Sequence, residues 1–471
     1  MAARCLSLLA ALVALGVLAS GCGGAQTSTE IPESASLAPV DAVVYATIVT
    51  DDDSSQWQKA ASVLERIPGT RDGLADAIES ALAEDGLDWK RDVAPALGPE
   101  VVIVVTAQRR PIVLLEPESE TKLEALLDAS DEAVVRGEID GRAVLAEKDA
   151  DLTAYRAALE RGTIEENASF IAGMEALPEE SLGRVWVNMG AVTDELDSLL
   201  RQATKENVDL GIDWLSASLS AEDDGLLVAM GLRTPGSGDT QYEPELFARV
   251  PVDAVAAISF GGTQGTLDRL QGQVDLSELS RSIEEATGVS LDGIVDALSG
   301  EGVLYVRPGE ELPDLTLALA PPDPDEVWET VDRLARNLAE QEDVPVTTVI
   351  ENGVEVSQLV VQDVAVRYAR LDSKTVVVTT GADSLRILGG DGPKLVDSEE
   401  YRRAADDVGL EGRTRGFAYV DVDGLLPLLE SLAGESAPEG GRDIIESIDS
   451  VVFQTSGEGE TSRVSGFVRI G

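Results

Sequence analysis

Two acidic clusters are the first places in this sequence where the side chains could carry chemistry. Asp51, Asp52 and Asp53 are consecutive, and Asp421 with Asp423 forms a second acidic pair. Carboxylate oxygens of this kind suit Ca²⁺, but neither group has the spacing of an EF-hand loop. Each group lies between an expected strand and an expected helix, where Asp commonly serves as an N-cap. We therefore favour helix capping over metal binding for both.

A glycine-rich stretch is the second candidate. Gly261, Gly262 and Gly265 follow an expected strand and open an expected helix, which is where a phosphate-binding loop would lie. The stretch lacks the Lys of a P-loop, and the corresponding place earlier in the chain is the acidic run at residues 51–53. We interpret it as a glycine-rich helix start.

The residue types that are missing exclude several kinds of catalysis. The sequence has no His, and its two Cys are Cys5 and Cys22. His is the usual general base near neutral pH and the commonest zinc ligand. A Cys-His catalytic pair and a Cys/His metal cluster are therefore excluded. We expect no cofactor and no enzymatic activity; a hydrolase that uses paired carboxylates is the alternative.

The charge balance is strongly acidic. The 471 residues include 36 Lys and Arg against 87 Asp and Glu, a net charge of −51, and the acidic residues are spread along the chain. Such a surface repels nucleic acid, so we expect no nucleic-acid partner. Apolar residues make up 44% of the chain, which is enough to build sizeable cores.

The N-terminus predicts a targeting segment. Arg4 precedes an apolar run at residues 6–17, and Ala19-Ser20-Gly21 stands directly before Cys22. This order resembles the lipobox of bacterial lipoproteins, which implies a signal peptide at residues 1–21, diacylation of Cys22 and palmitate at the anchor. We expect a flexible tether at residues 22–35 and a lipid-anchored protein on the extracytoplasmic face of the cell membrane.

The rest of the chain is an internal repeat. Pro39 to Val43 returns unchanged as Pro251 to Val255, and further matches follow in the same order over about 200 residues. These include Val102 to Val105 with Val303 to Val306. The repeat predicts module 1 at residues 36–234, a linker at residues 235–246 and module 2 at residues 247–471.

Strand-like runs alternate with tight turns in both copies. Hairpins are expected around Asp140-Gly141 and, in the second copy alone, around Asn352-Gly353. We expect an α+β fold of two tandem homologous modules, each a mostly antiparallel sheet with helices packed on one face. The five Trp stand in apolar patterns and are expected to pack in cores.

The order of motifs resembles the bacterial family catalogued as domain of unknown function 3352. The matching residues are Leu37-Ala38-Pro39-Val40-Asp41-Ala42, Leu97-Gly98-Pro99-Glu100, Asp140-Gly141 and Tyr419-Val420-Asp421-Val422-Asp423. The resemblance covers nearly all of residues 36–471, but the first copy has Val187-Asn188-Met189-Gly190 in place of the late acidic motif. The family implies a fold and a location, and no activity.

These observations predict a non-enzymatic, surface-tethered envelope lipoprotein that acts as a binding or scaffold module. Its partners are expected to be the membrane, through the acyl anchor at Cys22, and a protein or hydrophobic ligand of unknown identity. The alternatives are a carrier of a lipid or other hydrophobic ligand, held between sheet and helices, and the carboxylate-based hydrolase described above.

Overall fold

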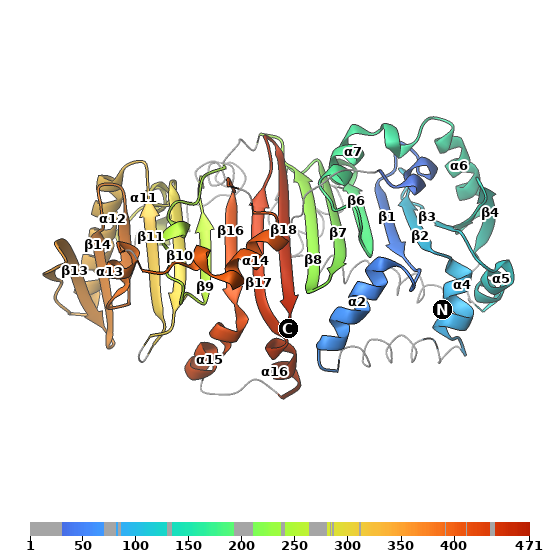
Figure 1. Ribbon diagram of the computed structural model, residues 1–471. Helices are drawn as coiled ribbons and strands as arrows, with labels where there is room; N and C mark the ends of the chain where they lie inside the picture. Colours follow the sequence, from blue (N-terminus) through green and yellow to red (C-terminus); the bar gives the residue numbers. More distant parts are fainter. Residues whose placement is uncertain are drawn as a thin grey trace. The chain divides into compact units, whose positions relative to one another are not determined.

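The computed structural model describes residues 31–69, 82, 86–129, 134–192, 211–236, 241–262, 280–282, 284, 287–309, 312–390, 392–410, 412–433 and 439–471 (Figure 1). The predicted signal peptide and Cys22 lie outside these ranges. No helix among the described residues is long and apolar enough to cross a membrane.

The chain divides into two compact units. Unit 1 comprises Met1–Pro235, Asp443–Ser447 and Thr461–Gly471, and unit 2 comprises Gly236–Arg442 and Ile448–Glu460. The last strand of the chain therefore belongs to unit 1, although the repeat assigns it to module 2. The structure also differs from the expected tether, since Glu33–Leu37 forms a 3-10 helix (η1) in which Ala35 and Leu37 are buried.

Unit 1 is built on an antiparallel sheet in the order β18-β8-β7-β6-β1-β2-β3-β5-β4. Its strands are β1 (Val44–Val49), β2 (Glu100–Val105), β3 (Pro111–Leu115), β4 (Val135–Ile139), β5 (Arg142–Ala146), β6 (Gly183–Asn188), β7 (Trp214–Glu222), β8 (Gly225–Arg233) and β18 (Thr461–Ile470). Its helices are α2 (Ser55–Arg66), α4 (Ala94–Leu97), α5 (Glu120–Asp128), α6 (Asp149–Leu159) and α7 (Ala168–Glu175), with short turns η2 (Trp89–Val93) and η3 (Ile164–Glu166).

Helices cover both faces of this sheet. On one face, residues of α6 and α7 pack in a core with Val102 and Val104, around the edge-to-face rings of Tyr45, Phe170 and Trp186. On the other face, α4 and α5 pack in a second core with alternate strand residues, Val101 among them. The expectation of helices on one face is therefore wrong, because β2 is apolar at consecutive positions and must bury both sides.

Unit 2 is built on an antiparallel sheet in the order β17-β16-β9-β10-β11-β15-β14-β13-β12. Its strands are β9 (Ala256–Phe260), β10 (Glu301–Arg307), β11 (Asp314–Ala320), β12 (Thr347–Glu351), β13 (Val354–Val361), β14 (Val364–Arg370), β15 (Val376–Thr379), β16 (Gly416–Asp421) and β17 (Ile448–Ser456). Its helices are α11 (Leu291–Ala297), α12 (Pro324–Gln341), α13 (Ser384–Leu388), α14 (Glu399–Asp407) and α15 (Val422–Ala433), with short turns η4 (Phe247–Arg249) and η5 (Leu395–Asp397); α16 (Glu439–Glu446) contributes residues to both units.

Both predicted hairpins are confirmed. β4 pairs with β5 across Asp140-Gly141, and β12 pairs with β13 across Asn352-Gly353. All four turn residues have positive φ, between 48° and 85°. An Asn-Gly or Asp-Gly pair tolerates this geometry and matches the twist of the flanking strands.

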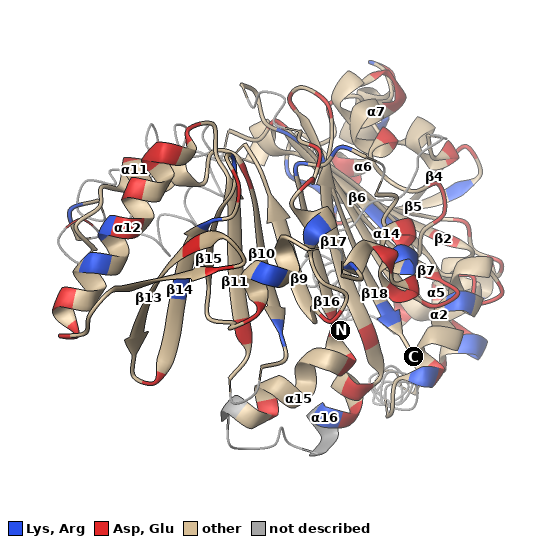
Figure 2. Ribbon diagram, turned by 60° about the vertical axis from the view of Figure 1, so that its left-hand side comes forward, with Lys and Arg blue, Asp and Glu red and all other residues tan. Residues whose placement is uncertain are grey.

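Charged side chains are spread over both units. Asp and Glu are distributed over helices and loops, with Lys and Arg among them (Figure 2). Most of the ion pairs join side chains that are at least partly exposed, such as Arg336 with Asp332 on α12. The charge is therefore distributed over the surface, and exposed pairs of this kind each contribute about 0–1 kcal/mol of stability.

Candidate apolar ligand-binding site

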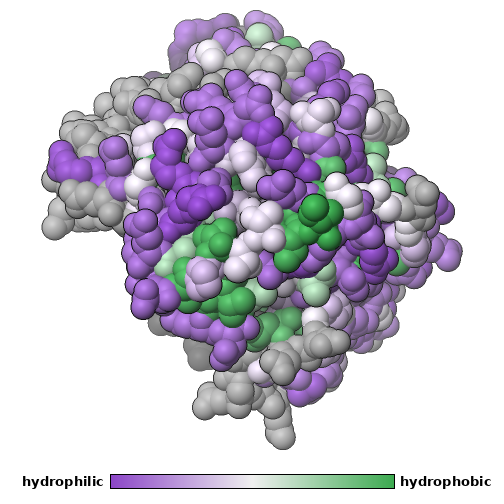
Figure 3. All heavy atoms as spheres, turned by 90° about the vertical axis from the view of Figure 1, so that its left-hand side faces the viewer, coloured by the Kyte–Doolittle hydropathy of each residue, from purple (hydrophilic) through white to green (hydrophobic). Residues whose placement is uncertain are grey.

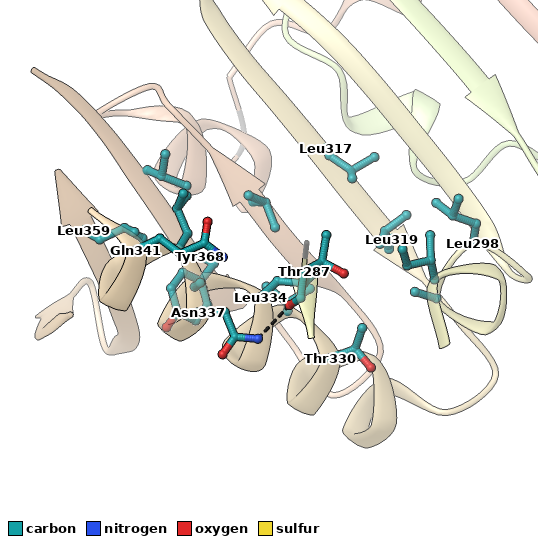
Figure 4. Close-up of a pocket in the computed structure, with 17 residues that line it drawn as sticks. Thr287, Leu298, Leu317, Leu319, Thr330, Leu334, Asn337, Gln341, Leu359 and Tyr368 are labelled. Carbon is teal, nitrogen blue, oxygen red and sulfur yellow. Dashed lines mark hydrogen bonds between the residues drawn. The ribbon is translucent and has the colours of Figure 1, made fainter. Parts of the chain in front are cut away.

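A pocket of about 480 Å³ lies between α12 and the sheet of unit 2 (Figure 4). Its size falls in the range of about 300–1,000 Å³ that is usual for small-molecule sites. Its walls come from α11, α12, β11, β13, β14 and β15, and from the segment just before α11. The lining residues are Thr287, Ile294, Ala297, Leu298, Leu317, Leu319, Thr330, Val331, Leu334, Ala335, Asn337, Leu338, Gln341, Leu359, Val366, Tyr368 and Val378.

Helix α12 forms one wall of the pocket because its sequence is amphipathic. Asp323 caps it by accepting hydrogen bonds from the backbone N–H groups of Asp325 and Glu326, and Pro324 occupies its first turn. Val331, Leu334 and the neighbouring lining residues recur at helical spacing and face the sheet, and charged residues occupy the opposite side. The helix thus presents an apolar face to the pocket and a charged face to solvent.

The sheet wall is set by strand register. Leu317 of β11 lies directly opposite Val378 of β15, which lies directly opposite Tyr368 of β14. Side chains opposite each other in antiparallel strands project from the same face, so these three point together toward α12. Leu319 and Leu359 complete this wall (Figure 4).

Tyr368 anchors α12 to the sheet at one side of the pocket. Its hydroxyl donates to Asp332 Oδ1 at 2.9 Å, and its ring lies 5.5 Å from the ring of Trp328, centroid to centroid. Burial, followed by the hydrogen bond to Asp332, raises the pKa of the Tyr368 hydroxyl to about 12. The hydroxyl is therefore neutral at physiological pH.

Among the described residues, the lining of this pocket includes no Lys, Arg, Asp or Glu. Its polar groups are hydroxyls and amides, and Asn337 Nδ2 donates to the carbonyl of Thr287 at 2.6 Å (Figure 4). A second pocket of unit 2, of about 510 Å³, contains the carboxylate of Asp372, which pairs with Arg249 at 3.1 Å. The residues that the structure describes in these two pockets do not include the pair of carboxylates that a glycoside hydrolase needs.

Two clusters of buried residues lie beside the pocket, and Trp328 and Val331 pack against both. One small buried cluster is centred on Val327 and Leu319, and another on Ala335, Leu359 and Tyr368. In unit 1, the shorter helix α5 instead places Leu123 fully buried in a single core cluster. Apolar side chains also gather on the surface at the end of unit 2 that carries β13 and α12 (Figure 3).

The predicted acidic cluster at residues 51–53 is exposed, and its carboxylates lie within 4.8 Å of one another. Asp51 accepts from the backbone N–H of Asp53 at 2.9 Å, and Asp52 pairs with Lys90 at 3.2 Å. The N-cap of α2 is Ser54, not one of the three Asp. The capping role favoured for this cluster is therefore wrong, because the chain makes one further turn before the helix begins.

The acidic pair at the end of β16 does include a helix cap. Asp421 accepts a hydrogen bond from the backbone N–H of Gly424 at 3.0 Å, at the start of α15. At the end of β6, Asn188 accepts in the same way from Ala191 at 3.2 Å. Asn and Asp are equally good N-caps, which explains why the first copy departs from the acidic motif without losing the turn.

Gly261 and Gly262 follow β9, as predicted, and Gly265 lies outside the described residues. A Cβ atom on Gly261 would lie 2.5 Å from the ring of Tyr242. Tyr242 in turn makes a hydrogen bond of 2.8 Å with the hydroxyl of Ser259. Close packing against Tyr242 accounts for Gly261 without a phosphate ligand.

The sequence matches a known family over its N-terminal part. The family described as "Protein of unknown function (DUF3352)" matches residues 1–127. This match confirms the family resemblance over residues 1–127. A comparison with curated proteins finds no match.

Solved structures give only a distant similarity. Crystal form IV of TP0453 is 10% identical and covers 50% of this chain and 94% of its own, with a TM-score of 0.25. Crystal form III of the same protein is 10% identical and covers 48% of this chain and 93% of its own, with a TM-score of 0.23. At these scores the similarity carries no argument about the present chain.

The residue patterns of the sequence do not predict the position of this pocket. The signals that could have found it are the length of α12, 18 residues against nine in α5, and the additional hairpin of β12 and β13, which supplies Leu359. The sequence predicts the additional hairpin and an apolar space between sheet and helices, but it does not indicate which helix would leave a cavity.

Proposed function

We propose that this protein is a non-enzymatic, lipid-anchored protein of the extracytoplasmic face of the membrane, and that unit 2 holds a hydrophobic ligand beneath α12. The observation that carries the proposal is the uncharged pocket of about 480 Å³, whose walls are mostly Leu, Val, Ile and Ala side chains. Sites of this composition bind small molecules mainly through burial of apolar surface.

We further infer that the two units are copies of one module, and that the second copy carries the pocket beneath α12. Strand register supports this inference. Val44 pairs with Val105 and Val187, and the corresponding Ala256 pairs with Val306 and Val420. Duplication lets one copy acquire a ligand site while the other maintains a stable scaffold.

A neutral fluorescent probe, N-phenyl-1-naphthylamine, tests binding in the pocket. The protein is expected to enhance the fluorescence of this probe, and Leu334→Trp, which fills the pocket from α12, is expected to weaken binding at least tenfold. Leu429→Trp is the matched control, because Leu429 is 51% exposed on α15, away from the pocket. Equal binding by Leu334→Trp and the unmodified protein, with both folded by thermal denaturation, would reject the proposed site.

The anchor is tested separately by cell fractionation. The unmodified chain should remain with membranes after a wash in high salt, because burial of acyl chains does not depend on ionic strength. Cys22→Ser should move the protein to the soluble fraction. Membrane retention of the Cys22→Ser protein, or release of the unmodified chain by salt, would contradict lipidation at this residue.

A further inference from the structure

A row of apolar side chains runs through the pocket of unit 2 and continues beyond it on the same face of the sheet. Tyr368, Val378, Leu317, Leu304 and Ile258 belong to β14, β15, β11, β10 and β9, and each lies directly opposite the next in the antiparallel register. We call these five residues the apolar row. Directly opposed residues share a face, so the row is continuous across five strands.

The two halves of the apolar row differ in their cover. Tyr368, Val378 and Leu317 line the pocket beneath α12. Leu304 and Ile258 lie beyond the pocket and are 37% and 49% exposed, and Leu315, two residues before Leu317 in β11, is 48% exposed. Central strands of a sheet rarely leave large apolar side chains open to water without a partner.

The length of the apolar row indicates how long a hydrocarbon chain it could bind. Adjacent strands are about 4.8 Å apart, so the four steps from Tyr368 to Ile258 span about 19 Å. An extended hydrocarbon with bonds of about 1.5 Å advances about 1.3 Å per bond, so about 15 bonds cover this distance. The pocket half alone spans two steps, about 10 Å, which corresponds to about eight carbons.

The polar groups of the pocket restrict the charge that the head group of the ligand can carry. Thr330, Asn337 and Gln341 offer a hydroxyl and amides, and the described lining residues include no cation to pair with a carboxylate or phosphate. Burying an unpaired charge is costly, and the net charge of −51 also repels anions. A head group seated among these residues therefore has to be uncharged.

We propose that unit 2 binds one long, unbranched acyl chain of an uncharged lipid. This inference rests on the proposed function of the pocket. The chain lies along the apolar row, with one half beneath α12 and the other half over Leu304 and Ile258. The occupant thus covers the exposed side chains that the protein leaves open.

The test uses 1-monoacylglycerols with chains of 8, 12 and 16 carbons, each competing with N-phenyl-1-naphthylamine on the full chain. Each buried methylene strengthens binding up to about fourfold, so the 16-carbon chain should bind at least about 100-fold more tightly than the 8-carbon chain. Palmitate, with the same chain and a carboxylate head, should bind more weakly than the 16-carbon monoacylglycerol.

A variant in the open half provides the second arm. Ile258→Asn should weaken the 16-carbon ligand at least tenfold and leave the 8-carbon ligand within twofold. Val360→Asn is the control, because Val360 is 51% exposed on β13 and lies outside the row. Equal affinity for the 8-carbon and 16-carbon ligands would show that the apolar row does not bind the acyl chain, although the pocket could still bind a ligand. If no monoacylglycerol displaced the probe, the proposed function of the pocket would be rejected as well. A dimer that Ile258→Asn converts to a monomer would assign the row to a second copy and contradict the proposal.

Discussion

At the scale of single residues, Glu301 is the most unusual carboxyl group in unit 2. It lies at the start of β10, and its Oε1 accepts a hydrogen bond from the backbone N–H of Leu246 at 2.5 Å. Burial raises its pKa from 4.5 to about 7, against the opposing effect of the backbone donors at Leu246 and Phe247. The corresponding Glu100 of unit 1 instead lies 3.5 Å from Arg142. The two positions thus differ, and at Glu301 burial produces a carboxyl that titrates near neutral pH.

This shift predicts a pH dependence of stability. Because the folded protein holds the proton more tightly than the unfolded chain, the contribution is fully present below about pH 4.5 and is lost as the pH rises through about 7. We expect a loss of about 1–2 kcal/mol over this range after allowance for partial solvent screening. Chemical denaturation at several pH values measures it, and Glu301→Gln should remove that part of the slope.

The control for this prediction is Glu243→Gln. Glu243 is exposed and is not among the groups that shift the pKa of Glu301. Its substitution should leave the pH profile of the unmodified protein unchanged. Identical profiles for Glu301→Gln and Glu243→Gln would show that the Glu301 carboxyl does not carry the effect.

The repeated motif is also explained at this scale. Asp253 accepts two hydrogen bonds, of 2.9 and 2.6 Å, from the guanidinium of Arg307, whose side chain is 11% exposed. Asp41, the same residue of the first copy, pairs with Arg161 at 2.9 Å. The motif Asp thus joins the start of the first strand to another element of its unit, which is a scaffold role.

At the scale of elements, the helix that follows the late strand of each copy depends on one capping side chain. Asp421→Ala should cost about 1 kcal/mol of stability, because the backbone N–H of Gly424 loses its acceptor. Asp421→Asn should preserve stability, since Asn188 makes the equivalent hydrogen bond in unit 1. Burial raises the pKa of the Asp421 carboxyl, so the neutral amide also avoids the cost of a half-buried charge.

Urea denaturation at pH 7 measures both variants. Asp423→Ala serves as the control, because Asp423 is exposed and lies two residues after Asp421, in the first turn of α15. Equal destabilisation by Asp421→Ala and Asp421→Asn would show that the negative charge, and not the cap, is what this position requires.

Local features of the fold could be predicted from the sequence, and features that depend on packing could not. The turns at Asp140-Gly141 and Asn352-Gly353 were predictable because backbone conformation alone requires those residues. The cap at Ser54 was missed because three Asp stand before it and any of them could have begun the helix. The pocket was missed because a cavity depends on how α12 meets the sheet, which no pattern in α12 alone determines.

At the scale of the whole molecule, three features bear on function: a predicted lipid anchor at Cys22, two units with the same strand register, and a pocket in unit 2 whose apolar row extends beyond it. The anchor would hold the protein beside a membrane, which is a source of acyl chains. The acidic surface would keep anionic head groups at a distance. Together these features favour a protein that takes up one uncharged lipid and does no chemistry on it.

Native mass spectrometry of the full chain, extracted gently from the cells that produce it, is the decisive test of lipid binding by unit 2. We expect a fraction of the protein with the added mass of one uncharged lipid with a long acyl chain, and loss of that mass in Leu334→Trp but not in Leu429→Trp. Bare protein in every preparation, or a bound mass that Leu334→Trp leaves unchanged, would contradict it.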